Sequence, residues 1–150
     1  MDLHALIKDL PLVEHLTEAE KDHLAGMEHA LVRFGSGDTV ISEGDESRCL
    51  FLLLKGSCLV TKTINGANIR LAKLKSGEIF GEMACLAKRK RQSNVIASED
   101  VLVLKMDDAF FEKLTPGIVA KIKDYMMDLL IMRLDKMNDA IMRISTLMRT

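Results

Sequence analysis

Three residues between positions 81 and 91 have side chains or backbone freedom suited to holding a sugar phosphate: Gly81, Glu82 and Arg91. Gly81 lets the backbone bend and lets a ligand come close. Residues 82–87 favour a short helix, and the amides that open such a helix have no intrahelical partner, so they can point at an anion. Arg91 can offer a two-pronged hydrogen-bonding group to a phosphate. Glu82 cannot face a phosphate, but it can accept hydrogen bonds from a sugar hydroxyl, so the group suggests a ribose-phosphate pocket.

Each of these residues also has a plain structural interpretation. Glu82 fits the first turn of a helix, where an acidic side chain is favourable. The run from Lys88 to Arg91 fits a solvated basic turn, which is the usual structural role of such a run. Residue types alone leave both interpretations open.

Residues 80–95 resemble the phosphate-binding cassette of cyclic nucleotide-binding domains, which are found in catabolite activator proteins, regulatory subunits of cyclic-AMP-dependent kinase and cyclic-nucleotide-gated channels. That cassette runs Phe-Gly-Glu-(Leu/Met)-Ala, a short variable stretch, then Arg, two small residues and a strand ending in Val. Residues 80–84 (Phe-Gly-Glu-Met-Ala) and 91–95 (Arg-Gln-Ser-Asn-Val) fall at the family spacing. With glycine turns at positions 37, 44, 56 and 77, the resemblance covers about residues 10–135.

The resemblance implies a role for individual residues. Arg91 would pair with the cyclic phosphate, helped by the amides of Met83, Ala84 and Gln92, and Glu82 would bind the ribose 2′-hydroxyl. Side chains on two strands would line the purine, and Arg133, near the lid position of the last helix, would stack on it. An exposed helix charge is the alternative for Arg133. The ligand-binding residues predicted in this way are Gly81, Glu82, Met83, Ala84, Arg91, Gln92, Ser93, Val60, Leu71, Ala72 and Arg133.

The resemblance implies cAMP or cGMP as ligand, and two departures from the family pattern bear on the choice. Lys90 stands where many members have proline, and Gln92 stands where many have alanine, serine or threonine. A hydroxyl at position 92 often accompanies cGMP preference, and Gln92 has none, which favours cAMP. We expect no cofactor and no metal, since Cys49, Cys58 and Cys85 lack metal-ligand spacing.

The predicted fold class is α+β, a β jelly-roll barrel flanked by N-terminal helices and a long C-terminal helix. Apolar residues recur at helical intervals in 1–30, and Thr17 and Glu20 form a capping-box pattern. From residue 31 short stretches rich in β-formers alternate with glycine turns, and Asn65-Gly66 predicts a hairpin. We therefore expect a helical segment at 1–30, a cyclic nucleotide-binding barrel at 31–106 with its cassette at 80–95, and helices at 107–150. The expected strands are 31–34, 39–41, 49–54, 58–64, 69–74 and 95–106.

Composition and spacing argue for a binding protein rather than an enzyme. No histidine follows His29, which disfavours a metalloenzyme barrel and Ser-His-Asp or Cys-His catalysis, and there is no Walker loop.

A net charge of −1, no tryptophan and 4% aromatic residues disfavour nucleic-acid binding, and the sequence to Thr150 contains no DNA-binding module. No apolar run is long enough to cross a membrane. Three unevenly spaced cysteines without a signal pattern favour a cytoplasmic protein.

Nothing breaks the helix predicted from residue 118 to about residue 149. Its second half carries an apolar seam that alternates by three and four residues, as in a coiled coil. A helix this long needs a partner to bury such a stripe, which favours a parallel homodimer. A helix of another protein, or the chain's own domain, remains an alternative. The seam residues are Met127, Leu130, Leu134, Met137, Ile141, Ile144 and Met148.

Two functional hypotheses follow. In the first, the chain is a cyclic nucleotide sensor, for cAMP by the Gln92 argument, that transmits binding through its C-terminal helix. In the second, it is a nucleotide-independent scaffold that acts through the methionine-rich helix. A third hypothesis is redox sensing through Cys85, beside the start of the phosphate-binding helix. A small buried residue is the alternative for Cys85.

Overall fold

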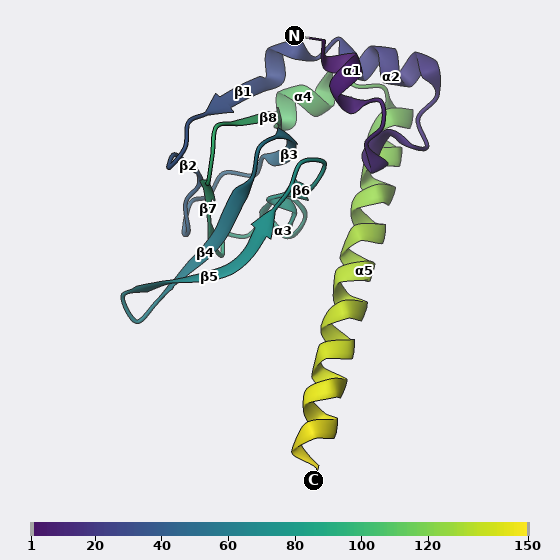
Figure 1. Ribbon diagram of the computed structural model, residues 1–150. Coiled ribbons are helices and arrows are strands. Elements are labelled where there is room, and N and C mark those ends of the chain that lie inside the picture. Colours follow the sequence, from purple (N-terminus) through teal and green to yellow (C-terminus); the bar gives the residue numbers. More distant parts are fainter. Residues whose placement is uncertain (1, 150) are drawn as a thin grey trace. The chain divides into compact units, whose positions relative to one another are not determined.

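The computed structural model describes residues 2–149, apart from the side chain of Leu86. The chain divides into two compact units, the first ending at Thr115 and the second beginning at Pro116 (Figure 1). The first contains the strands, the short helices and the cassette, and the second is a single long helix.

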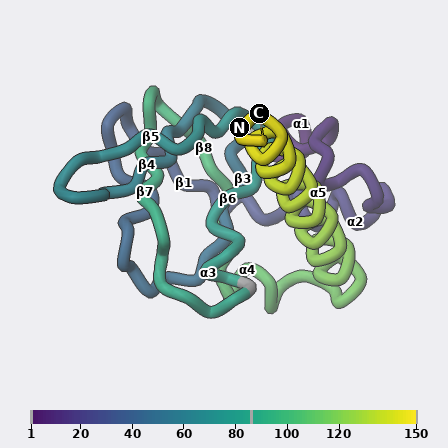
Figure 2. Tube along the Cα trace, turned by 90° about the horizontal axis from the view of Figure 1, so that it is seen from below, coloured from purple at the N-terminus to yellow at the C-terminus, as the bar shows by residue number. Residues whose placement is uncertain are grey.

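The strands of the first unit form two antiparallel four-stranded sheets. One has the order β1-β8-β3-β6 and the other β2-β7-β4-β5, and Figure 2 shows β4, β5 and β7 running side by side. The predicted α+β, jelly-roll-like fold is confirmed, but over the described residues the two sheets do not close into a barrel. The strand bounds are β1 Leu31–Phe34, β2 Thr39–Ile41, β3 Leu50–Lys55, β4 Cys58–Ile64, β5 Ala67–Leu74, β6 Ile79–Phe80, β7 Asn94–Ala97 and β8 Val101–Met106.

Apolar side chains from both sheets form one core. Strand β3 is buried from Leu50 to Leu54, as expected for a strand that lies between two neighbours, here β8 and β6. The rings of Phe51 on β3 and Phe80 on β6 stack with their centroids 5.2 Å apart. This packing fixes the end of β6, from which the chain enters the cassette. The buried core residues are Ile41, Phe51, Leu53, Cys58, Leu74, Phe80, Val95, Ala97, Val101 and Val103.

Short helices flank the sheets, and their starts follow the predicted capping residues. The Thr17 hydroxyl accepts from the Glu20 amide at 3.1 Å, and the Glu20 carboxylate accepts from the Thr17 amide at 2.9 Å, which is the predicted capping box. Asp107 caps α4 by accepting from the Phe110 amide at 2.9 Å. The bounds are α1 Leu3–Ile7, η1 Pro11–Val13, α2 Glu18–Ala25, η2 Glu28–Ala30 and α4 Asp108–Glu112.

The prediction of a single strand over residues 95–106 is wrong. Residues 98–100 interrupt it, so that β7 lies in one sheet and β8 in the other. Polar contacts hold the interruption: the Ser98 hydroxyl donates to the Ser57 carbonyl at 2.8 Å, and the Ser36 amide donates to Asp100 at 3.0 Å. The chain can therefore change sheets within three residues. Strand β6 also forms where only a turn was expected.

Alanine at Gly56 should destabilise the fold more than alanine at Gly37. Both glycines have a φ of +89°, so both substitutions place a side chain in a left-handed conformation, at a cost of about 1 kcal/mol. A Cβ at Gly37 would meet nothing within 4 Å, whereas one at Gly56 would lie 2.5 Å from the Asp100 carbonyl oxygen. We expect Gly56→Ala to lose a further 1–3 kcal/mol or so in urea unfolding. Equal losses for the two variants would contradict this account.

Cys58 should make the fold less stable at alkaline pH. Its side chain is fully buried, and burial, with a smaller effect of Glu99, raises the pKa of the thiol from its ordinary value of 9.0 to about 11. Between these values the unfolded chain has released the proton and the folded chain still holds it, so stability falls as pH rises, by up to about 2 kcal/mol. Urea unfolding below pH 9 and near pH 11 measures the fall. Cys58→Ala should show a shallower one, and an identical fall would contradict the prediction.

The second unit is α5, Pro116–Met148, close to the unbroken helix that the sequence predicted from residue 118 to about residue 149. Its buried residues are Ile118, Ile122 and Met126. All the predicted seam residues but Leu130, which is half-buried, are exposed large hydrophobics. Among the described residues no helix combines the length and apolar character needed to cross a membrane.

Candidate functional site

Gly81 joins β6 to the helix of the cassette, α3, which spans Glu82–Ala87. It caps α3 in the left-handed conformation, with a φ of +84°. A Cβ at this position would lie 2.7 Å from Nη1 of Arg91 and 3.1 Å from the carbonyl oxygen of Cys49. Both the backbone conformation and the close approach of Arg91 therefore require glycine.

Arg91 lies beside the start of α3, with its side chain directed at three neutral acceptors. Its Nη1 donates to the Gly81 carbonyl at 2.8 Å, its Nη2 to the Cys49 carbonyl at 2.6 Å and its Nε to the Ser47 hydroxyl at 3.3 Å. Only 4% of the residue is exposed. Burial lowers the pKa of the guanidinium, while Cys49, Asp45 and Cys85 act in the opposite direction. The guanidinium is thus fixed in place and remains charged.

The loop after β2 holds the backbone of Arg91. The Gly44 amide donates to the Arg91 carbonyl at 2.8 Å, and the Arg91 amide donates to the Asp45 carbonyl at 2.8 Å. This pair of bonds ties the returning arm of the cassette to residues about 45 positions earlier in the chain, so the arginine is positioned by its backbone as well as its side chain.

Lys62 on β4 makes a second connection to the cassette. Its Nζ donates to the Gln92 carbonyl at 2.7 Å and lies 4.0 Å from the Glu43 carboxylate. Sequence reasoning missed Ser47, Cys49 and Lys62. The turn at Gly44-Asp45 and the strand expected at 49–54 were the sequence signals near the first two, and neither indicated a contact with Arg91.

The predicted cassette residues differ in burial. Glu82 and Ala84 are buried, with Glu82 only 7% exposed, whereas Met83 is exposed. Gln92 is exposed and its side-chain amide donates to the Lys90 carbonyl at 3.1 Å; Ser93 is half-buried. The structure therefore brings Gly81 and Arg91 into direct contact and places the Glu82 carboxylate at the first position of α3, next to Gly81.

The residues predicted to line the purine lie on paired strands. Val60 on β4 is half-buried and pairs with Ala72 on β5 and with Val95 on β7. A bulge leaves Leu71 without a register partner, since Val60 pairs with Ala72 and Thr61 with Arg70. Ala72 is exposed, and Leu71 is 53% exposed. Arg133 lies on α5 in the second unit, so its relation to the cassette remains a prediction.

This arrangement can hold an anion next to a hydroxyl-bearing group. A buried arginine and the start of a short helix offer hydrogen-bond donors, and a buried carboxylate offers acceptors. Lys88, Arg89 and Lys90 are exposed, and the Lys90 ammonium lies 3.9 Å from Glu46, a weak surface pair. Within residues 2–149 no cluster of three or more side chains could ligate a metal.

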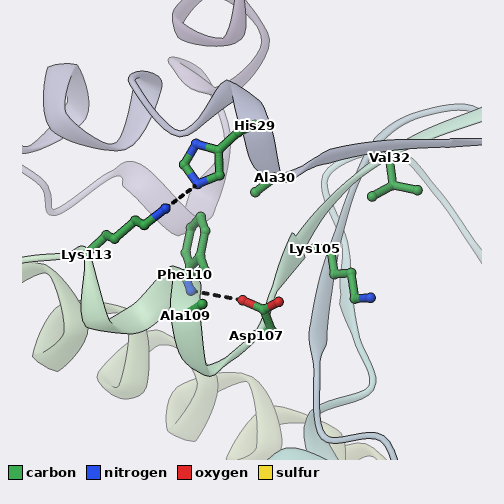
Figure 3. Close-up of a pocket in the computed structure, with 8 residues that line it drawn as sticks. All are labelled: His29, Ala30, Val32, Lys105, Asp107, Ala109, Phe110 and Lys113. Carbon is green, nitrogen blue, oxygen red and sulfur yellow. Dashed lines mark hydrogen bonds between the residues drawn. The ribbon is translucent and has the colours of Figure 1, made fainter.

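A pocket of about 160 Å³ lies elsewhere in the first unit, where β1 and β8 meet η2 and α4 (Figure 3). Figure 3 shows that Asp107 accepts from the Phe110 amide, and that the Lys113 ammonium and His29 Nε2, 3.4 Å apart, face each other. No predicted ligand-binding residue lines this pocket, so it is not the candidate site. Its lining residues are His29, Ala30, Val32, Lys105, Asp107, Ala109, Phe110 and Lys113.

Comparison with known proteins gives the same assignment as the cassette. Residues 31–115 match the family model of the cyclic nucleotide-binding domain. A cAMP-dependent protein kinase regulatory subunit of Aspergillus niger is 31% identical over 110 residues, which are 73% of this chain and 26% of that protein. The cGMP-dependent protein kinase 2 of Homo sapiens is 36% identical over 96 residues, 62% of this chain and 12% of that protein.

Among solved structures, the catabolite activator protein of Thermus thermophilus matches with a TM-score of 0.75 and 26% identity, over 90% of this chain and 63% of that one. The chain spans about a quarter or less of the length of the two kinase relatives. The family match covers more than half of the chain and includes the whole cassette. The chain belongs to the cyclic nucleotide-binding domain family.

Proposed function

We propose that this chain binds a cyclic nucleotide at residues 80–95 and acts as a regulatory module rather than an enzyme. The phosphate binds the Arg91 guanidinium and the amides of Met83, Ala84 and Gln92, and Glu82 accepts from the ribose 2′-hydroxyl. The observation that supports this proposal best is that Arg91 is almost completely buried, beside the start of α3 and next to the buried Glu82.

The burial of Arg91 supports anion binding on energetic grounds. Removing a charged group from water is costly unless an opposite charge or good hydrogen bonds compensate. The three hydrogen-bond acceptors of Arg91 are neutral, so they satisfy its N–H groups without neutralising its charge. A guanidinium has five N–H groups, so a phosphate can bind those directed away from these acceptors and supply the opposite charge.

We propose cAMP as the preferred ligand. The relatives named above are a regulatory subunit of a cAMP-dependent protein kinase and a cGMP-dependent protein kinase, so their names do not decide between cAMP and cGMP. The exposed Gln92 supplies no hydroxyl next to Arg91, and its amide donates to the Lys90 carbonyl. The apolar side chains of Val60, Leu71 and Ala72 pack on the purine, and Arg133 stacks on it.

A calorimetric titration with cAMP and then with cGMP tests this proposal. We expect cAMP to bind with a Kd of about 1 μM or tighter and cGMP to bind more weakly. Non-cyclic AMP is the matched control, since it has the same base and sugar, and it should bind more weakly than cAMP. Tighter binding of cGMP would overturn the choice of ligand, and no heat with either cyclic nucleotide would overturn the proposed function.

We propose that binding is transmitted through α5 and that α5 pairs with a second copy of the chain. The exposed seam from Met127 to Met148 supports self-association, because a helix with so long an apolar stripe gains stability by burying it. The same exposed seam also favours a second candidate, a scaffold that assembles without nucleotide. Sedimentation with and without cAMP separates the two, since only a sensor should change its assembly when cAMP binds.

A further inference from the structure

Two cysteines approach the Arg91 guanidinium from different elements. Cys49 directly precedes β3, and its carbonyl accepts from Nη2 of Arg91 at 2.6 Å. Cys85 lies in α3, four residues after Gly81, whose carbonyl accepts from Nη1 of Arg91 at 2.8 Å. Both cysteines also act electrostatically on Arg91. Two cysteine residues therefore lie close to the group that we propose binds the phosphate.

The third cysteine has a different environment. Cys49 and Cys85 are half-buried, so a small reagent can reach part of each residue, whereas Cys58 is fully buried in the core. Burial also raises the pKa of the Cys58 thiol to about 11, which suppresses the reactive thiolate near neutral pH. Cys58 is therefore an internal control for reactions at the other two cysteines.

The charges around Cys49 and Cys85 favour an anionic reagent. Arg91 donates to the carbonyls of Cys49 and Gly81, and the exposed Lys88, Arg89 and Lys90 directly follow α3. A cluster of positive charge raises the local concentration of small anions. A reagent with carboxylates should thus reach these thiols sooner than a cationic reagent of the same chemistry.

We propose that Cys49 and Cys85 form a modification site for small anionic disulfides, and that an adduct there excludes the nucleotide phosphate. This inference rests on the proposed function. In the reaction a cysteine thiolate attacks one sulfur of the reagent, the reagent's S–S bond breaks, and a new S–S bond joins protein and reagent. The other half leaves as a thiolate and takes up a proton from water. The bound half places its bulk and its carboxylates beside Arg91, where the phosphate would bind.

The experiment treats the whole chain with glutathione disulfide, which is anionic, and in parallel with cystamine, a cationic disulfide. We expect glutathione disulfide to react faster at low salt and to lose this advantage at high salt. Mass spectrometry should place the adducts on Cys49 and Cys85 and not on Cys58, and saturating cAMP should slow their formation. The modified protein should bind cAMP at least about tenfold more weakly, and a reducing agent should restore binding.

Variants keep this test falsifiable. Cys49→Ala, Cys85→Ala and the double variant are each compared with themselves before and after treatment, and only the double variant should be insensitive. Circular dichroism of the modified protein separates blocked binding from unfolding. Unchanged cAMP affinity after full modification, or adducts on Cys58 alone, would overturn the inference while leaving the proposed function intact. Failure of the untreated, reduced protein to bind either nucleotide would instead overturn the proposed function.

Discussion

Replacing Arg91 with alanine should weaken cyclic nucleotide binding by about 10-fold to about 100-fold or more. A hydrogen bond to a charged group contributes about 1.5–3 kcal/mol, which corresponds to this range of Kd. The loss should be at the upper end, because Arg91 is buried and held by the Gly81 and Cys49 carbonyls, so its guanidinium need not be ordered when the ligand binds. Calorimetric titration of both proteins with cAMP measures the change.

Two further substitutions make the Arg91 experiment specific. Arg91→Lys keeps the charge but cannot reproduce the planar, forked geometry, so we expect it to bind more weakly than the original chain and more tightly than Arg91→Ala. Arg89→Ala removes an exposed charge two residues away and should change the Kd by less than about threefold. Thermal unfolding of each variant separates lost binding from lost structure. If folded Arg91→Ala bound cAMP as tightly as the original chain, the assignment of the phosphate site would be wrong.

The contact between Gly81 and Arg91 illustrates what the sequence could predict about the site. A glycine, a short helix and an arginine ten residues after the glycine predicted that the chain returns to the helix start, and the 2.8 Å bond from Arg91 to the Gly81 carbonyl agrees with this. Two other acceptors, Ser47 and the Cys49 carbonyl, could not be predicted. They lie more than 40 residues earlier, and a main-chain carbonyl acceptor leaves no signature in the residue type.

The strands show a similar limit to what can be predicted from the sequence. Stretches rich in β-forming residues and bounded by glycine turns predicted β1, β2 and β4 with the observed bounds, because these patterns are local. The same patterns joined β7 and β8 into one strand. The residues that separate them are held by distant partners, Ser57 and Ser36, so the break depends on tertiary contacts. For the same reason the sequence could not show whether the two sheets close into a barrel.

Helix α5 was predictable as an element but not as an interface. Its apolar spacing predicted an unbroken helix with an apolar seam in its second half, whereas the buried Ile118, Ile122 and Met126 lie in its first half. The seam in its second half is exposed in this single chain. An apolar seam indicates that a partner is favourable, but its spacing does not by itself identify that partner.

Lysine at two seam positions, Leu134→Lys with Ile141→Lys, should convert a dimer of this chain into monomers. Each change removes about 1.5–3 kcal/mol of apolar burial from each helix and places a charge in the seam, and a twofold assembly contains each change twice. The matched control is Met132→Lys with Met142→Lys, which adds the same charges at exposed positions of α5 outside the seam. Sedimentation equilibrium should give a dimer for the original chain and the control, and a monomer for the seam variant.

The seam experiment also tests how cyclic nucleotide binding would be transmitted from the domain to α5. An isolated helix with an exposed apolar stripe is marginally stable, so the monomeric seam variant should also show less helix by circular dichroism than the control. If cAMP binds the monomeric variant with a different affinity from the dimer, the two equilibria are coupled, and by linkage cAMP must shift dimerisation by the same factor. Equal cAMP affinities would show that the seam assembles independently of the pocket, which would favour the scaffold. A monomeric original chain at all concentrations would exclude self-pairing and leave the seam to a helix of another protein.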